Sequence, residues 1–204
     1  MMKYIVGLIA LILLAAGAYY FLTAAPAAEP TDNTPQEPAV MATSTYATST
    51  FTAVYPRDFT VDENYFYQGV PNKPIAGVKF TIPMTMATGT NLSSDSYVSV
   101  EWLPRATLCT GDIFVLQNVR AESMTDEGRT YSHATTSGAA AGNLYEEHLY
   151  AFPNSKPCTA VRYYIHTTSL ANYEPGVVQE YDRAKLLEAF DSIRRSVTLI
   201  PQTP

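Results

Sequence analysis

A thiol and an imidazole occur on the same predicted strand, in the stretch SKPCTAVRYYIHTTS at residues 155–169. Cys158 would be a nucleophile if His166 could take its proton, which requires the two groups to lie within hydrogen-bond reach. The two residues are eight positions apart, at 158 and 166. At about 3.3 Å per residue along a strand, their Cα atoms would be separated by roughly 26 Å. His166 therefore cannot activate Cys158.

Cys109 and Cys158 are the 2 cysteines of the chain. Both lie in the part that we expect to be exported, where disulfides persist. A bridge between them would close a loop of roughly 50 residues, which the chain-entropy model credits with about 4 kcal/mol of stability. The alternative is two free thiols. We predict a disulfide between Cys109 and Cys158.

The 3 histidines, His133, His148 and His166, show none of the spacings that are typical of a zinc site. Glu146 and His148 would share one face of a strand, but two ligands do not make a metal site. The sequence also lacks a G-x-S-x-G nucleophile motif and the glycine-rich loops that hold phosphates. We therefore expect no catalytic residue, no metal and no cofactor, and a protein that is not an enzyme.

The strongest predicted strand is CTAVRYYIHTTSL, at residues 158–170. Its alternation sends one set of side chains to the core, namely Val161, Tyr163 and Ile165. Unless another element covers it, the opposite face shows Arg162, Tyr164 and His166, about 7 Å from one to the next. Such a row can bind an acidic or sugar-like group through charge-assisted hydrogen bonds and ring contacts, so these three residues are the candidate binding site. The alternative is that they only satisfy neighbouring carboxylates such as Glu146 or Glu147.

Tyrosine is abundant, with 15 residues against 1 tryptophan. Its ring offers a large rigid surface with a polar tip, which suits interfaces and saccharide-facing surfaces. Tyrosine is also common in half-buried strands, so the sheet alone can explain the number. The composition leaves both interpretations open.

Alternating apolar and polar residues predict strands in IAGVKFTIP (75–83) and YVSVEWLP (97–104), and a bent pair of strands in residues 128–153. The stretch DRAKLLEAFDSIRRSV (182–197) predicts one amphipathic helix. Its apolar face consists of Leu186, Phe190, Ile193 and Val197. Strands followed by a terminal helix imply an α+β domain, in which the helix packs on a largely antiparallel sheet.

The N-terminal residues resemble a membrane anchor. From Tyr4 to Leu22 the chain carries no charge, and a helix of this length would span roughly 28 Å, close to the hydrocarbon thickness of a bilayer. Lys3 would hold the N-terminus inside, so that the rest of the chain lies outside the cytoplasm. We predict a transmembrane helix in residues 1–25. The alternative is a cleaved signal peptide.

Residues 26–50 are rich in Pro, Thr, Ala and Ser and show no hydrophobic period. Such a composition cannot bury enough surface to offset the entropy of ordering, so we predict a disordered linker. Residues 51–204 would then form the extracytoplasmic domain.

The formal net charge is −6, without a basic cluster in the sequence. This charge argues against nucleic acid and against anionic lipid head groups as partners. Two classes of function remain: a membrane-tethered binding or interaction module of the cell envelope, with an envelope protein or a glycan as partner, and an envelope hydrolase with an unrecognised active site. A pocket joining Glu146 or Glu147 with Arg162 and a histidine would favour the hydrolase. A flat tyrosine-rich surface would favour the binding module.

The order of the stretches YPRDFTV, NLYEEHLYAF, CTAVRYYIHTT and FDSIRRSVTLI resembles that of the PsbP-like fold over residues 51–200. It also resembles that of uncharacterised single-pass proteins of the bacterial envelope. The PsbP-like fold includes membrane-tethered lipoproteins and photosystem accessory proteins, which act mostly by binding. The resemblance therefore implies a binding module. This chain lacks the lipid-attachment cysteine of the lipoproteins, so its anchor would have to be the N-terminal helix.

Overall fold

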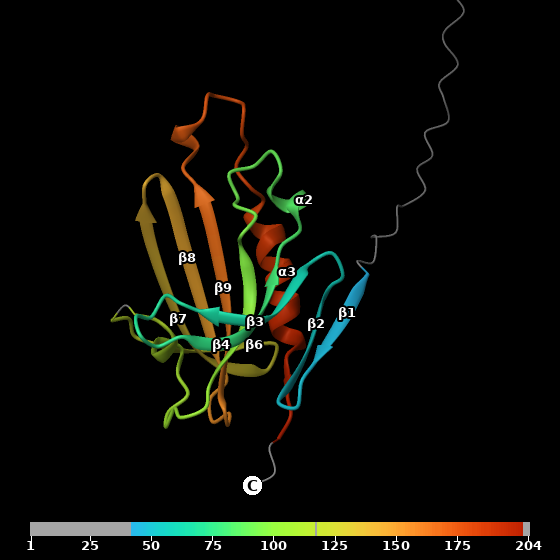
Figure 1. Ribbon diagram of the computed structural model, residues 1–204, viewed down its shortest axis with the longest axis vertical. Coiled ribbons are helices and arrows are strands. Elements are labelled where there is room, and N and C mark those ends of the chain that lie inside the picture. The colour runs from blue at the N-terminus through green and yellow to red at the C-terminus, as the bar shows by residue number, and fades with distance from the viewer. Residues whose placement is uncertain (1–41, 117, 202–204) are drawn as a thin grey trace, which may run out of the picture. The chain divides into compact units, whose positions relative to one another are not determined.

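The computed structural model describes residues 42–116 and 118–201 (Figure 1). The predicted transmembrane helix at residues 1–25 and most of the predicted linker lie outside these ranges. Within the described ranges, no helix is long and apolar enough to cross a membrane.

Most of the regular secondary structure in the described residues is strand, and one long helix lies near the C-terminal end, before the last strand. The strands are β1 (Thr43–Ala47), β2 (Phe51–Pro56), β3 (Thr60–Tyr67), β4 (Ile75–Thr81), β5 (Tyr97–Leu103), β6 (Glu122–Asp126), β7 (Arg129–Ala140), β8 (Asn143–Ala151), β9 (Cys158–Thr168) and β10 (Thr198–Leu199). The helices are α2 (Met84–Ala87) and α3 (Arg183–Ser196), with 3₁₀ turns η1 (Gly111–Phe114) and η2 (Leu170–Asn172).

The larger sheet of the described part has seven strands in the order β3-β4-β5-β9-β8-β7-β6. All of its neighbouring strands are antiparallel. The apolar residues that alternate in the predicted strand at 75–83, namely Val78, Phe80 and Ile82, are all buried. The predicted α+β class with a largely antiparallel sheet is confirmed.

The domain begins earlier than the sequence predicted. Residues 43–47 form β1, which pairs antiparallel with β2, while β10 pairs with β2 on the other side. The ring of Tyr46 lies 6.0 Å from that of Phe51 and 5.9 Å from that of Phe80, so this strand has a side chain that reaches the core. The predicted end of the linker at residue 50 is therefore corrected. Composition alone hid the strand, because Thr, Ser and Ala surround this one aromatic residue.

Helix α3 packs against the main core as its spacing predicted. Leu186, Phe190 and Ile193 are fully buried, and the Phe190 ring lies 5.3 Å from that of Tyr163 on β9. Asp182 caps the helix by accepting a hydrogen bond from the backbone N–H of Lys185 at 3.0 Å. Figure 1 shows α3 beside the β1–β2 hairpin. Helix and hairpin together cover one face of the large sheet.

A buried arginine joins the end of α3 to this core. Arg194 lies in the last turn of α3, where a cation interacts favourably with the helix dipole. Its guanidinium is also enclosed between the rings of Tyr131 and Tyr150, 4.8 and 4.5 Å away. It donates hydrogen bonds to the Tyr163 hydroxyl at 2.8 Å and to Asp126 at 2.6 Å. The charge therefore ties the helix to β6 and β9.

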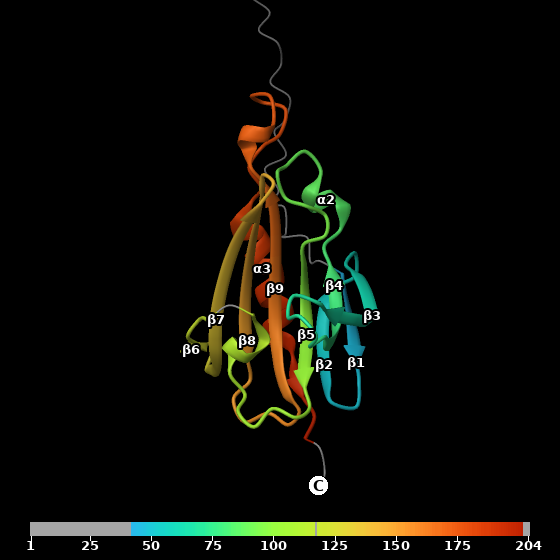
Figure 2. The ribbon, with the colours of Figure 1, turned by 60° about the vertical axis from the view of Figure 1, so that its left-hand side comes forward.

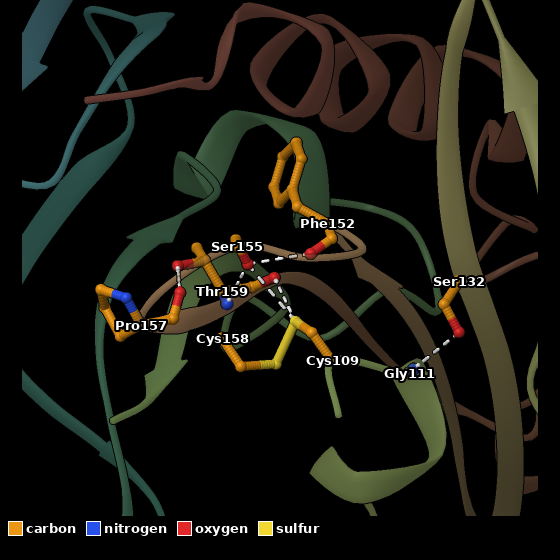
Figure 3. Close-up of a disulfide and its surroundings, with 8 residues drawn as sticks. All are labelled: Cys109, Gly111, Ser132, Phe152, Ser155, Pro157, Cys158 and Thr159. Carbon is orange, nitrogen blue, oxygen red and sulfur yellow. Dashed lines mark hydrogen bonds between the residues drawn. A yellow bond between two sulfur atoms is a disulfide. The ribbon is translucent and has the colours of Figure 1, made fainter. Parts of the chain in front are cut away.

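The other face of the large sheet carries a smaller core beneath the loop that follows β5. Its buried members are Ile75, Phe114, Ala134, Leu149, Ala151, Cys158 and Ala160. The predicted disulfide between Cys109 and Cys158 is confirmed, with Cα atoms 5.1 Å apart. Figure 3 shows the bridge joining this loop to the start of β9. It fixes the loop over half of the sheet face.

We expect the double variant Cys109→Ser/Cys158→Ser to lose about 2 to 4 kcal/mol of unfolding free energy, because the bridge spans 49 residues and restricts the unfolded chain. Urea unfolding of the variant, of the oxidised parent and of the reduced parent measures the loss. The reduced parent should unfold at the same urea concentration as the variant. Equal midpoints for variant and oxidised parent would contradict the prediction.

Acid should weaken the contact between α3 and β6. The guanidinium groups of Arg195 and Arg194 lower the pKa of Asp126 from its ordinary 3.8 to about 2. Because the folded-state pKa is depressed, this contribution is complete above about pH 4 and is lost as the pH falls towards 2. Asp126→Asn should therefore show a flatter loss of stability between pH 5 and pH 2 than the parent, in urea titrations at each pH. Asp58→Asn, at an exposed position, should retain the slope of the parent.

Candidate functional site

The second face of the large sheet carries the predicted binding residues. Register places Tyr164 of β9 between Tyr97 of β5 and Glu147 of β8, and places His166 beside Tyr145. Arg162 lies one step nearer to the disulfide, beside Ser99. Opposite residues of neighbouring strands point to the same side, so these side chains share one face.

Arg162 does not face solvent, which corrects the prediction of an exposed row of three. Its side chain is 0% exposed. Its Nε and Nη2 donate to the two carboxylate oxygens of Glu101 at 2.8 and 2.9 Å, and Nη2 also donates to the Phe114 carbonyl at 2.8 Å. Nη1 donates to Glu147. The alternative, that Arg162 satisfies a neighbouring carboxylate, holds for this residue.

An aromatic ring closes the arginine site from the edge of the sheet. Tyr67 of β3 lies over the guanidinium of Arg162, with 3.4 Å between the ring centroid and Cζ. Its hydroxyl donates to a Glu147 oxygen at 2.9 Å. Burial acts to lower the pKa of Arg162, but the carboxylates of Glu101 and Glu147 raise it above the ordinary value. The guanidinium therefore stays charged between two carboxylates.

The buried ion pairs connect directly to the aromatic part of the face. Ser99 donates to a Glu101 oxygen at 2.7 Å, and the hydroxyl of Tyr65 lies 3.5 Å from the same oxygen. The hydroxyls of Tyr65 and Tyr97 share a hydrogen bond of 2.7 Å. Burial raises the pKa of both phenols, so both keep their protons at neutral pH. These bonds hold the first rings of the face in fixed positions.

Five rings form a continuous row across β3, β5, β9 and β8, which we call the tyrosine face. Successive centroids lie 5.5, 4.9, 6.1 and 4.6 Å apart, and the second and fourth pairs are stacked. The row is Tyr65, Tyr97, Tyr164, Tyr145 and His166. All of them except Tyr97 are partly exposed to solvent. The sheet thus presents a preformed aromatic surface.

Polar groups lie at both ends of the tyrosine face. At one end the Lys79 ammonium is 5.4 Å from the Tyr65 centroid. At the other end the His166 Nδ1 lies 2.8 Å from an Asp95 oxygen, and its Nε2 lies 3.1 Å from the Asn143 side-chain oxygen. Charged and amide groups beside exposed rings can orient a polyhydroxylated ligand.

The residues whose meeting in a pocket would favour a hydrolase are divided between the two faces of the sheet. Glu147, Arg162 and His166 lie on the face of the tyrosine row, but the Arg162 guanidinium is enclosed there and bonded to Glu147. His148 and Glu146 lie on the face of α3. On that face His148 Nε2 and Glu146 are 2.5 Å apart. Within the described residues no group of three His, Cys, Asp or Glu side chains could hold a metal ion.

Sequence reasoning missed most members of the site. Glu101 and Ser99 occupy the polar positions of the alternating strand at 97–104, yet both are fully buried. Tyr97 has the same parity as these two residues, and Tyr145 has the same parity as Glu147, so alternation did contain the signal. No local pattern indicates which strands are neighbours in the sheet, and the row depends on that order.

Comparisons with protein-family models and with curated proteins returned no match to this chain. The chemistry of the site is therefore interpreted from its own geometry.

Arg162→Met should cost about 3 to 5 kcal/mol in unfolding free energy, because Glu101 is left as a buried charge without its partner. The double variant Glu101→Gln/Arg162→Met should recover part of this loss, because it also removes the buried carboxylate charge that Arg162→Met leaves without a partner. Urea unfolding of the parent and of the three variants, including Glu101→Gln, measures the coupling. If the double variant loses as much unfolding free energy as the two single variants together, Glu101 and Arg162 are not coupled and the prediction is wrong.

Proposed function

We propose that this protein is a membrane-tethered binding module of the cell envelope, and that the tyrosine face is its binding surface. The observation that carries the proposal is the row of partly exposed rings on a sheet whose opposite face is packed. Rigid aromatic surfaces bind at low entropic cost, because few rotamers are lost when the ligand arrives.

The ligand class that fits this surface best is a glycan. A sugar ring has an apolar C–H face that can lie on an aromatic ring, and hydroxyl groups at its edge that need donors and acceptors. Tyr164 and Tyr145 supply adjacent rings 6.1 Å apart. Lys79 and Asp95 supply charged groups at the two ends of the row. An extended chain of sugars would meet rings and polar groups in turn.

The alternative of an envelope hydrolase has less support. Glycoside hydrolysis needs a pair of carboxyl groups that can reach the substrate. Glu101 is fully buried against Arg162, and Glu147 bonds to both Arg162 and Tyr67. Neither group is free to act as acid or base. The proposed role is therefore binding without catalysis.

The proposed location outside the cytoplasm is supported by two features. The uncharged run from Tyr4 to Leu22 has the length of a membrane-spanning helix. The disulfide between Cys109 and Cys158 is of a kind that persists in oxidising compartments. We also propose that the domain is related to the PsbP-like fold. The support for this relationship is the order of the elements alone.

Loss of two rings from the centre of the tyrosine face should weaken retention on envelope glycan. We expect Tyr145→Ala/Tyr164→Ala to bind isolated cell-wall glycan at least about tenfold more weakly than the parent, because truncated central anchors typically cost more than 1 kcal/mol each. The measurement is co-sedimentation of the purified protein with the glycan over a range of concentrations.

The matched control is Tyr173→Ala, which removes an exposed tyrosine from the segment after η2. This variant should bind like the parent. A second arm uses envelope extract from which the glycan has been digested. Retention of the parent on that extract, together with no binding to glycan, would replace the glycan with a protein partner. If a folded double variant binds the glycan as well as the parent does, the binding site lies outside the tyrosine face.

A further inference from the structure

Three cations from distant parts of the sequence gather at the disulfide-bonded end of the domain. Figures 1 and 2 show the β1–β2 turn, the loop after β5 and the loop before β9 at this end, opposite the tip of the β7–β8 hairpin. The cations are Lys73, Arg105 and Lys156, which we call the basic end. The sequence contains no basic run because these positions are far apart along the chain.

Two grooves bring these cations together. One has a volume of about 820 Å³ and includes Lys73 and Arg105 in its lining. The other, of about 700 Å³, includes Arg105 and Lys156. Arg105 therefore lies between the two grooves. No acidic residue of the described chain lines either of them.

The three cations are available for a partner. The ion pairs of the described residues use other cations, such as Arg162, Arg183 and Arg194, and include none of the basic end. In a chain of net charge −6, three unpaired positive groups at one end create a local field of opposite sign. This field attracts anions.

The basic end also presents apolar surface. Leu108 is 72% exposed at the first groove. Pro104 and Ala106 line both grooves, and Ile113 lines the first. The disulfide at Cys109 holds the adjoining loop in this shape. Cations around an exposed leucine on a fixed loop match the boundary between the head groups and acyl chains of a bilayer.

We propose that the basic end binds the surface of an anionic phospholipid bilayer. Lipid phosphates lie among Lys73, Arg105 and Lys156, and Leu108 enters the apolar boundary beneath them. This reverses the expectation, drawn from the sequence, that anionic head groups are not partners. The contact is independent of the tyrosine face, which lies on the part of the sheet that the loop after β5 does not cover.

The length of chain before the domain permits such a contact. β1 runs from Thr43 towards the turn at residues 48–50, which lines the second groove. Residues 26–42, at no more than about 3.4 Å each, reach at most about 58 Å. An anchor in residues 1–25 would therefore allow the basic end to touch the same membrane. Such an anchor would determine which membrane the basic end contacts. The binding of lipid by the basic end does not itself require the anchor.

The single tryptophan of the chain provides the test. Trp102 lines the second groove beside Arg105, so its fluorescence should be quenched by brominated acyl chains when the basic end meets the bilayer. The full chain is reconstituted into vesicles of brominated phosphatidylcholine, with or without brominated phosphatidylglycerol at the same bromine content. The N-terminal run is present in both, so extra quenching in the anionic vesicles reports the basic end.

We expect clear extra quenching in anionic vesicles, which falls as salt is raised because the attraction is screened. Arg105→Glu should remove most of it, since reversing a charge weakens attraction to an anionic surface about tenfold or more. Leu108→Gln should remove a smaller part. Lys185→Glu makes the same change of charge on α3 and should leave the quenching unchanged.

Three results would overturn the proposal. The first is equal quenching in both kinds of vesicle. The second is an equal effect of Arg105→Glu and Lys185→Glu, which would mean that overall charge alone matters. The third is extra quenching that does not fall as salt is raised, which would mean that the charges of the basic end do not hold the domain on the vesicle. Each result is independent of glycan binding by the tyrosine face, so the two proposals can fail separately.

Discussion

The fold of this domain depends on one buried charge near the centre of its large sheet. The guanidinium of Arg162 is enclosed, and an enclosed charge is tolerated only if partners replace the water that it has lost. Two carboxylates, a backbone carbonyl and a tyrosine ring supply these partners. They come from β5, β8, η1 and β3. A single charge thus specifies how four separate segments must meet.

This arrangement divides the second face of the sheet into a closed half and an open half. Nearer to the disulfide, the loop after β5 covers the sheet and the face is core. Beyond Glu147, the rings of the tyrosine face other than Tyr97 are partly exposed, and hydrogen bonds from the ion-pair network reach the first rings through Tyr65. The groups that stabilise the fold therefore also fix the surface that we assign to binding.

Much of the fold was predictable, because local patterns determine it. The apolar period of residues 182–197 defined α3, alternation defined the faces of β4 and β9, and the presence of two cysteines indicated the bridge. The burial of Arg162 was not predictable in this way. It follows from the order of strands and from a loop distant in sequence, and neither leaves a periodic signal. The same reason explains the basic end, which is assembled from single residues of three loops.

If the domain is held by its N-terminus, as we propose, strand β1 has a mechanical consequence. It pairs with β2 alone, and Thr43, where the chain enters the strand, lies opposite Pro56, where β2 ends. A pull at Thr43 therefore loads the backbone hydrogen bonds one after another, from Thr43 towards Ala47. The strand contributes exposed or half-buried side chains, with Tyr46 as its largest contact. Under tension β1 should peel away first, lengthening the connection to the domain while α3, the large sheet and the disulfide remain intact.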